Sequence, residues 1–275
     1  MSSLVSVIIT TKNESGVIRK LLSSLKNQSY KNIEIILIDN NSTDSTKEIA
    51  KKFTKRIYNF GPERSAQRNF GAKLAHGDYL LFLDADMELS VRVIQECIDS
   101  IRLSNQLGGV IIPEKSVAKN FWEKVKAYER SFYNERGDEI TDAARFFRKS
   151  IFKKAKGYDE TITGPEDWDL PETIKNLGYQ VSRISAVIYH HERINSPIDL
   201  AKKKYYYALR AYRYLKKHNI STFSPKTIYF FRPVFYKDFN KIVSHPMLYT
   251  GMFIMLFAQL IGGGLGYLVG RIKKL

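Results

Sequence analysis

The chain has 275 residues, of which 44% are hydrophobic, and it contains a single cysteine, Cys97. This composition excludes a wholly disordered chain, which lacks the apolar surface that offsets the entropy of ordering, and it excludes a disulfide framework or multi-cysteine metal site. The formal charge of +16 is uneven: residues 1–199 have 30 Lys and Arg against 27 Asp and Glu, whereas residues 200–275 have 14 against one. A nearly neutral N-terminal part and a basic C-terminal part indicate two different tasks.

Short apolar runs alternate with helical patterns in the first 90 residues. Three runs are short and rich in β-branched or aromatic residues, which predicts buried strands at 4–10, 33–38 and 79–83. Apolar spacing and capping residues predict helices at 13–27, 42–50 (its capping residues included) and 65–75. Strands that alternate with helices in this way predict an α/β fold, with a parallel sheet and helices on both of its faces.

Polar side chains follow all three strands, at the edge of the sheet where ligands bind in such folds. The first strand leads into residues 10–14, the second into Asp39, and the third into Asp84 and Asp86. A polar residue after a strand is often only a turn residue, and Asp39 could simply cap the next helix. Asp84 and Asp86 are harder to explain in this way, because two neighbouring carboxylates repel each other unless a cation such as Mg²⁺ or Mn²⁺ lies between them.

Four motifs resemble those of the family 2 glycosyltransferases, which are inverting enzymes of the GT-A fold. They read VSVIITTKNES at 5–15, IEIILIDNNSTDST at 33–46, RSAQRNFGAKLAHGDYLLFLDADM at 64–87 and GYDETITGPEDWDL at 157–170. They occur in the order of the family and span about residues 4–192. The resemblance implies a Rossmann-like, mainly parallel sheet flanked by helices. No Walker loop or G-x-G-x-x-G motif is present, which disfavours P-loop NTPases and dinucleotide dehydrogenases.

The resemblance also implies a nucleotide-sugar donor, usually a UDP- or GDP-sugar. It assigns three residues to the nucleoside pocket, namely Thr10, Asn13 and Glu14, and it assigns Asp39 to the nucleotide base. Arg68, together with Arg64, would assist at the diphosphate. A solvated helix face is an equally good interpretation for Arg64.

For the metal, the resemblance implies a divalent cation, Mg²⁺ or Mn²⁺, at the Asp-x-Asp pair. Asp86 would be the more direct ligand, and Asp84 would be shared between the metal and the ribose. Glu88 is a further candidate ligand, because it extends the series of carboxylates by two residues. Many GT-A enzymes carry a histidine that completes metal or diphosphate binding, and His190 is favoured for this role over its neighbour His191.

The resemblance assigns the acceptor end to the acidic segment at 164–170. Asp167 would be the general base that removes a proton from the attacking hydroxyl, Glu166 beside it would bind substrate, and Trp168 would stack on a sugar. The other interpretation is an acidic helix start with a packed tryptophan, since carboxylates stabilise the first turn of a helix.

Two acceptor classes remain open. Polyprenyl-phosphate sugar synthases attack with an ionised phosphate and need no base, so the intact Glu166-Asp167 pair favours a neutral hydroxyl. Two other features favour a polyprenyl phosphate as the acceptor. Such synthases also bind membranes, and Arg145 and Arg148 are candidates for holding a lipid phosphate. Together these features favour the hydroxyl of a glycan, carried on a lipid diphosphate, over a polyprenyl phosphate.

The C-terminal region predicts a membrane partner. Residues 200–245 interleave Lys and Arg with Tyr and Phe, and residues 246–271 form an apolar run long enough for one transmembrane helix, with a buried core helix as the alternative. Nothing in the region resembles a nucleic-acid-binding motif, so no nucleic-acid partner is expected. No secretory signal is visible before the first strand, which predicts a single-pass protein of the cell membrane with its catalytic domain in the cytosol.

Small residues recur within this apolar run at a spacing of four, at Ala258, Gly262, Gly266 and Gly270. Two membrane helices approach each other closely through such a pattern, so it raises a homo-oligomer as an interpretation.

The sequence thus predicts a GT-A catalytic domain at 1–199, a basic, aromatic juxtamembrane region at 200–245 and an anchor at 246–271. The predicted function is metal-dependent, inverting transfer of a sugar to a lipid-linked glycan at the cytosolic membrane face. A nucleotidyltransferase is disfavoured, because the glycine-rich basic loop that it needs after the first strand is missing. A non-catalytic membrane adaptor is disfavoured, because a degenerate site has no need of four acids, at Asp39, Asp84, Asp86 and Asp167.

Overall fold

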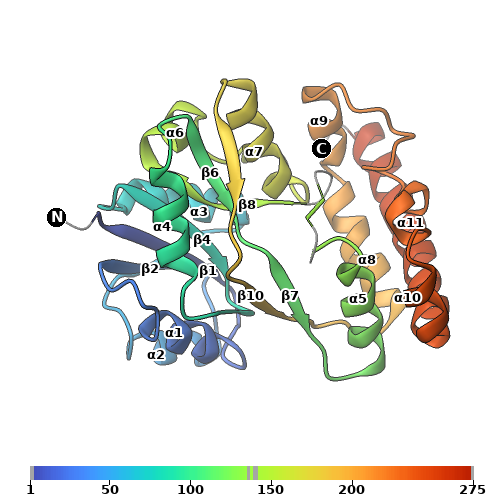
Figure 1. Ribbon diagram of the computed structural model, residues 1–275, viewed down its shortest axis with the longest axis horizontal. Helices are drawn as coiled ribbons and strands as arrows, with labels where there is room; N and C mark the ends of the chain where they lie inside the picture. Colours follow the sequence, from blue (N-terminus) through green and yellow to red (C-terminus); the bar gives the residue numbers. More distant parts are fainter. Residues whose placement is uncertain (1–2, 135–136, 139–141, 274–275) are drawn as a thin grey trace. The chain divides into compact units, whose positions relative to one another are not determined.

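The computed structural model describes residues 3–134, 137–138 and 142–273 (Figure 1). The chain divides into two compact units. Unit 1 comprises Met1–Glu114, Ala143–Glu160 and Asp167–His190, and unit 2 comprises Lys115–Asp142, Thr161–Glu166 and His191–Leu275. The division differs from a boundary at residue 199, because residues 115–142 group with the C-terminal part of the chain.

Unit 1 is built on a seven-stranded sheet with the order β3-β2-β1-β4-β8-β6-β9. The strands are β1 (Val5–Thr11), β2 (Ile33–Asp39), β3 (Ile57–Asn59), β4 (Tyr79–Asp84), β6 (Leu107–Ile111), β8 (Ala144–Arg148) and β9 (Gln180–Arg183). Neighbouring strands run parallel except at β8, which is antiparallel to both β4 and β6. The predicted α/β fold with a mainly parallel sheet is confirmed.

The strand register brings the polar strand ends together. Thr11 of β1 pairs with Asp39 of β2, and Thr10 of β1 pairs with Asp84 of β4. Since these three strands are parallel, their carboxyl ends meet at one edge of the sheet, which is where ligands bind in open α/β folds.

Side chains alternate along the central strands and fill a hydrophobic core on each face of the sheet. Val7 and Ile9 of β1 belong to a core that includes helices α1 (Ile18–Lys26) and α4 (Val93–Arg102), with the short helix α2 (Thr46–Ala50) at its border. Ile8 belongs to the opposite core, with α3 (Arg64–Leu74), α6 (Lys149–Lys154) and α7 (Glu166–Asn176). The prediction of helices on both faces is therefore confirmed.

A second, three-stranded sheet has the order β5-β10-β7. Its strands are β5 (Met87–Leu89), β10 (Ile188–His191) and β7 (Glu114–Val117), and the boundary between the two units falls within β7 and β10. β5 follows the Asp-x-Asp segment directly, and its Met87 pairs with His190 in the antiparallel register. This pairing brings His190 to the end of β4.

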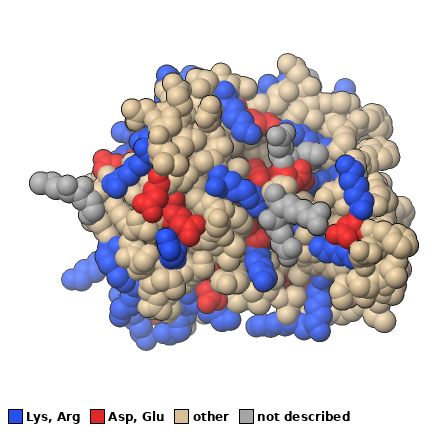
Figure 2. Space-filling model, viewed as in Figure 1, with Lys and Arg blue, Asp and Glu red and all other residues tan. Residues whose placement is uncertain are grey.

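Unit 2 is mostly helical. Its helices are α5 (Phe121–Ser131), α8 (Pro197–Ala208), α9 (Ala211–Lys217), α10 (Phe239–Ser244) and α11 (Pro246–Lys273), with two short 3₁₀ turns, η1 (Tyr229–Phe231) and η2 (Pro233–Phe235). Val125 of α5, Leu200 of α8 and Met255 of α11 share one buried core. In Figure 1 these helices lie side by side, and in Figure 2 the atoms over α11 are mostly uncharged.

The small residues of α11 pack within the chain. A methyl group built on Gly262, Gly266 or Gly270 would collide with a backbone carbonyl oxygen of α8 or of the residue after it, namely those of Ala201, Tyr205 and Leu209 in turn. The contacts advance by four residues on both sides, so α8 and α11 run parallel in direct backbone contact. The spacing that suggested self-association is thus used for a close helix pair inside unit 2.

Candidate functional site

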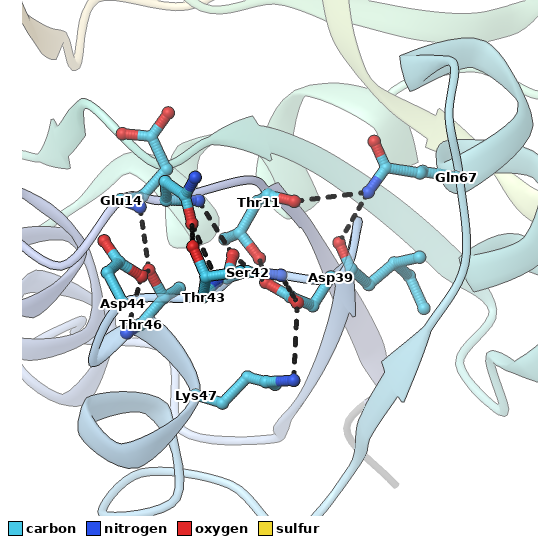
Figure 3. A network of polar contacts seen from close by, with 11 residues as sticks. Thr11, Glu14, Asp39, Ser42, Thr43, Asp44, Thr46, Lys47 and Gln67 are labelled. Carbon is cyan, nitrogen blue, oxygen red and sulfur yellow. Dashed lines mark hydrogen bonds and ion pairs between the residues drawn. The ribbon is translucent and has the colours of Figure 1, made fainter.

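The loops after β1 and β2 are joined by a polar network (Figure 3). Asp39 is fully buried and accepts hydrogen bonds from Thr11 Oγ1 at 2.8 Å, from the Ser42 amide at 2.7 Å and from Ser42 Oγ at 2.6 Å. Lys47 Nζ lies 4.0 Å from the same carboxylate. Asp39 therefore fixes the position of both loops at the edge where a nucleotide was predicted.

The other predicted nucleoside residues lie in or next to this network. Asn13 has a positive φ of 55°, and its Oδ1 accepts a hydrogen bond from the Thr43 amide at 2.9 Å. The Glu14 amide donates to Thr46 Oγ1 at 2.7 Å. Thr10 is buried within β1, whereas Asn13 is exposed and Glu14 is half-buried. Of the residues assigned to the nucleoside pocket, only Asn13 and Glu14 are within reach of solvent.

Arg68 connects two of the predicted functional acids. This side chain of α3 is fully buried, and its Nη1 lies 2.5 Å from Oδ1 of Asp167 at the start of α7. Its Nη2 lies 3.0 Å from Oδ1 of Asp84 at the end of β4. The guanidinium also stands over the ring of Tyr158, 5.0 Å from the ring centroid. The predicted diphosphate residue is thus engaged with two carboxylates, and it joins the donor acid to the predicted base.

Asp84 is surrounded by positive charge. Arg145 Nη1 lies 3.6 Å from its Oδ2, so each carboxylate oxygen faces a different guanidinium. Burial alone would raise the pKa of Asp84, but the charges of Arg68, Arg145 and Arg64 outweigh it and hold the pKa well below its usual range. Asp84 is therefore ionised throughout the neutral range.

Asp86 and His190 form the second cluster of this edge. His190 Nε2 lies 3.7 Å from Oδ2 of Asp86, and His190 Nδ1 lies 3.1 Å from Oε2 of Glu114. A carboxylate on the second ring nitrogen is the usual way to orient a metal-binding imidazole. Carboxylate oxygen suits Mg²⁺ and Mn²⁺, and a neutral imidazole is a common metal ligand, so the side chains present fit a divalent cation held by Asp86 and His190.

The part of the chain that the structure describes holds a partial set of metal ligands. Among the described residues, no group of three or more His, Cys, Asp or Glu side chains converges on one point. Because Mg²⁺ and Mn²⁺ commonly take one or two carboxylates and complete their shell with substrate phosphates, a partial ligand set is what such a site requires.

Sequence reasoning missed Glu114. Besides His190, its carboxylate binds Arg145, whose Nε and Nη2 lie 2.9 and 2.8 Å from Oε1. A single acid after a strand forms no motif, and only the position of β8 between β4 and β6 brings Glu114 near Arg145 and Asp84. The sequence offered no signal from which this pairing could have been found.

The arginines considered for a lipid phosphate have partners inside unit 1. Arg145 is buried between Glu114 and Asp84, and these acids raise its pKa although burial by itself would lower it. Arg148 donates to the backbone carbonyls of Ile101, Ser104 and Leu107. Neither geometry favours the interpretation that these two side chains hold a phosphate.

The three acids at the start of α7 differ in their exposure to solvent. Glu166 is 2% exposed and Asp169 is 1% exposed, whereas the side chain of Asp167 is 23% exposed. Trp168 is half-buried. Asp167 is therefore the acid of this motif that a second substrate can reach most readily.

Known proteins resemble the chain in sequence. Residues 6–155, more than half of the chain, match glycosyl transferase family 2. The chain is 27% identical over 206 residues to an uncharacterized glycosyltransferase of Rickettsia typhi. This alignment covers 70% of this chain and 62% of that protein. It is 36% identical over 94 residues to the GalNAc(5)-diNAcBac-PP-undecaprenol beta-1,3-glucosyltransferase of Campylobacter jejuni, which covers 30% of each. The matches span less than two thirds of these relatives' own lengths.

Solved structures share the fold at low sequence identity. S. aureus TarS 1-349 in complex with UDP-GlcNAc has a TM-score of 0.56 and 17% identity, with 94% of this chain and 90% of that chain covered. The mannosyltransferase PcManGT from Pyrobaculum calidifontis, in complex with GDP-Man and Mn²⁺, has a TM-score of 0.62 and 15% identity, with 96% and 86% covered. Since the family match covers more than half of the chain and the fold agrees with it, the protein belongs to glycosyl transferase family 2.

Proposed function

We propose that the protein transfers a sugar from a UDP- or GDP-sugar to a hydroxyl of a lipid-linked glycan at the cytosolic face of a membrane. The Arg68 bridge carries the proposal, because one buried guanidinium joins Asp84 of the donor motif to Asp167 of the acceptor motif. A direct displacement needs both substrates positioned in one site, and this pairing of motifs supports it. The Campylobacter relative, whose name specifies an undecaprenol diphosphate-linked acceptor, supports the acceptor class.

In this reaction Asp167 is the general base. It takes the proton of the acceptor hydroxyl while the hydroxyl oxygen attacks the anomeric carbon of the donor. The bond between that carbon and the diphosphate oxygen breaks, and the nucleoside diphosphate leaves with the electron pair, so the configuration at the carbon inverts. The exposure of Asp167 and the full burial of Arg68 suit a base that meets substrate while its partner only orients it.

At the leaving-group end, Asp86 and His190 are proposed to hold Mg²⁺ or Mn²⁺. The cation, when bound, stabilises the negative charge that develops on the departing diphosphate. Asp84, which is engaged by two arginines, would then contribute chiefly by positioning Arg68 and Arg145.

At the nucleoside end, the proposed contacts come from Thr10, Asn13, Glu14 and Asp39. Asn13 and Glu14 reach solvent and are proposed to meet the nucleoside directly. The carboxylate of Asp39 already accepts three hydrogen bonds, so it would act mainly by holding the loop around Ser42. Glu166 and Trp168 are proposed on the acceptor side.

The experiment is a transfer assay with the full chain, Mn²⁺ and a panel of UDP- and GDP-sugars. Two acceptors are compared, a glycan on a lipid diphosphate and a polyprenyl phosphate. We expect turnover with the glycan acceptor, and we expect Asp167→Asn to lower kcat by roughly 10²–10⁴-fold, the usual contribution of a general base, without loss of donor binding.

The matched control is Asp99→Asn, an exposed acid of α4 that accepts a hydrogen bond from Gln95, and it should keep wild-type activity. Full turnover by Asp167→Asn would overturn the base assignment. Transfer to the polyprenyl phosphate alone would replace the proposed acceptor by the other class.

A further inference from the structure

One face of helix α11 is apolar and open to solvent. It carries large side chains three or four residues apart, all between 47% and 79% exposed: Ile254, Phe257, Ile261, Leu265, Leu268 and Ile272. This spacing places the six on one side of the helix, which we call the apolar face. Contiguous exposed apolar surface of this kind marks an interaction site.

The opposite side of α11 is packed into unit 2. Met252, Met255 and Leu256 belong to the unit's hydrophobic core, and Gly262, Gly266 and Gly270 touch the backbone of α8 and of the residue after it. Within the described residues, α11 is the one helix long and apolar enough to cross a membrane, and about a third of its most apolar window is buried in protein. One side of the helix is therefore already occupied by protein along much of its length.

The partner helix is basic where the two backbones touch. α8 carries Lys202, Lys203 and Lys204 on the turn between the contacts of Ala201 and Tyr205. If the middle of α11 lay at the centre of a bilayer, these lysines would lie in hydrocarbon beside it. Charged side chains at that depth are strongly disfavoured, and in known membrane proteins they face a bundle interior or water. Lys202 and Lys203 are instead exposed.

Charge identifies the partner of the apolar face. Residues 200–275 carry 14 Lys and Arg and one acid, Asp238. Arg271 and Lys273 end α11, and exposed Tyr205 and Tyr206 flank the lysines of α8. An apolar stripe bordered by cations and tyrosines complements an anionic lipid surface, which offers phosphate groups above acyl chains.

We propose that α11 does not cross the membrane but lies in the headgroup region of an anionic leaflet, with its apolar face toward the acyl chains. α8 packs on the side of α11 away from the acyl chains, and its exposed Lys202 and Lys203 supply positive charge for the lipid phosphates. The proposal deepens the membrane attachment proposed above. It does not depend on the identity of the donor or the acceptor.

Labelling of engineered cysteines in membrane vesicles tests the topology. Lys273→Cys reports the end of α11, and Asp99→Cys reports the catalytic unit; the native Cys97 is buried and gives the background in the wild-type chain. We expect a membrane-impermeant maleimide to label both positions in inverted vesicles and neither in right-side-out vesicles. Labelling of Lys273→Cys in right-side-out vesicles, with Asp99→Cys labelled only in inverted ones, would show a span and overturn the proposal.

Binding to lipid vesicles tests the surface. The full chain is mixed with phosphatidylcholine vesicles with or without phosphatidylglycerol, and we expect stronger binding to the anionic vesicles that weakens with added salt. The double variant Phe257→Ser/Leu265→Ser should bind about a hundredfold more weakly, because each large apolar side chain removed from water contributes about tenfold or more. Leu103→Ser, an equally apolar and 83% exposed position of unit 1, is the control and should bind as the wild type does.

Two outcomes would overturn the proposal that the apolar face binds lipid. One is equal binding by the double variant and the wild type. The other is a wild-type dimer that the double variant converts to monomers without any change in vesicle binding, which would make the apolar face a contact between copies. Donor hydrolysis in detergent should be unchanged in the double variant, so failure of the membrane proposal and failure of the enzymatic one are distinguishable.

Discussion

Arg68 Nη1 lies 2.5 Å from the carboxylate of Asp167, although 99 residues separate the two in the chain. The other terminal nitrogen of the same guanidinium lies 3.0 Å from Asp84. Only a planar, forked cation can satisfy two carboxylates in this manner, and Lys, a single-point cation, cannot. Arg68 is therefore a positioning residue for both ends of the site.

Substitution of Arg68 should separate positioning from charge. Arg68→Lys keeps the charge but loses the fork, and we expect kcat to fall by about 10²-fold, the usual consequence of misplacing a reacting group by about 1 Å. Arg68→Met removes the charge and leaves Asp84 and Asp167, which are 17% and 23% exposed, without this partner, which should lower the free energy of unfolding by about 1–3 kcal/mol. Steady-state kinetics and denaturant unfolding measure the two effects.

The control for Arg68 is Arg92→Met. Arg92 is 69% exposed and lies 3.8 Å from Glu96 on the surface of unit 1, so its removal should change stability by less than about 1 kcal/mol. An Arg68→Lys variant with wild-type kcat would show that the bridge does not position the reacting groups.

Asp84 predicts how stability depends on pH. Its pKa in the folded chain lies well below the ordinary value, so the unfolded chain binds its proton first as the pH falls. The stabilisation by Asp84 is thus fully present above about pH 4 and is lost progressively below it. We expect the difference in unfolding free energy between the wild type and Asp84→Asn to be constant from pH 5 to 7 and to shrink below about pH 4. A difference that grows on acidification would contradict the assignment.

Metal binding should depend on one of the two adjacent histidines. His190→Ala removes the side chain 3.7 Å from Asp86, and we expect the Mn²⁺ affinity to fall by about 10–100-fold. Asp86→Ala should have at least the same effect, whereas His191→Ala, the matched neighbour, should leave the affinity unchanged. Titration of Mn²⁺ in the presence of a nucleoside diphosphate measures this without turnover. An equal loss of Mn²⁺ affinity in His190→Ala and His191→Ala would contradict the assignment of His190 as the metal ligand.

The glycines of α11 predict a contrast between neighbours. A methyl group at Gly266 meets the carbonyl of Tyr205, whereas one at Gly264 meets nothing within 4 Å. Gly266→Ala should therefore lower the free energy of unfolding by about 1–3 kcal/mol through overpacking. Gly264→Ala should be neutral or stabilise the chain by up to about 1 kcal/mol, since alanine favours the helix. Thermal unfolding in detergent compares the two variants.

The sheet and its ligand edge were predictable because local patterns determine them. Strand ends at Thr10, Asp39 and Asp84 could be read from short apolar runs, and parallel pairing follows from alternation with helices. The order of strands beyond β4 could not be read in this way. β8 is inserted antiparallel between β4 and β6, and this insertion is what brings Arg145 and Glu114 into the site.

The role of the small residues in α11 was also beyond the sequence. Small residues at a spacing of four show that a helix has a face on which another helix can pack closely. The spacing does not say which helix packs there. Gly262 and Gly266 pack on α8, whose lysines appeared in the sequence only as a basic stretch. A pattern typical of contacts between chains thus serves a contact within one.

Because α8 and α11 pack so closely, the rotation of α11 about its axis determines both the glycine contacts with α8 and the direction of the apolar face. Because each residue turns an α-helix by about 100°, one residue inserted after Gly266 would rotate Gly270 away from Leu209 and carry Leu268 and Ile272 toward the side that now packs on protein. The depth of the lysines and the direction of the apolar side chains would then change together. Insertions into this segment can therefore be accepted in evolution only when they restore the orientation of the residues that follow. An insertion of three or four residues, about one helical turn, does so.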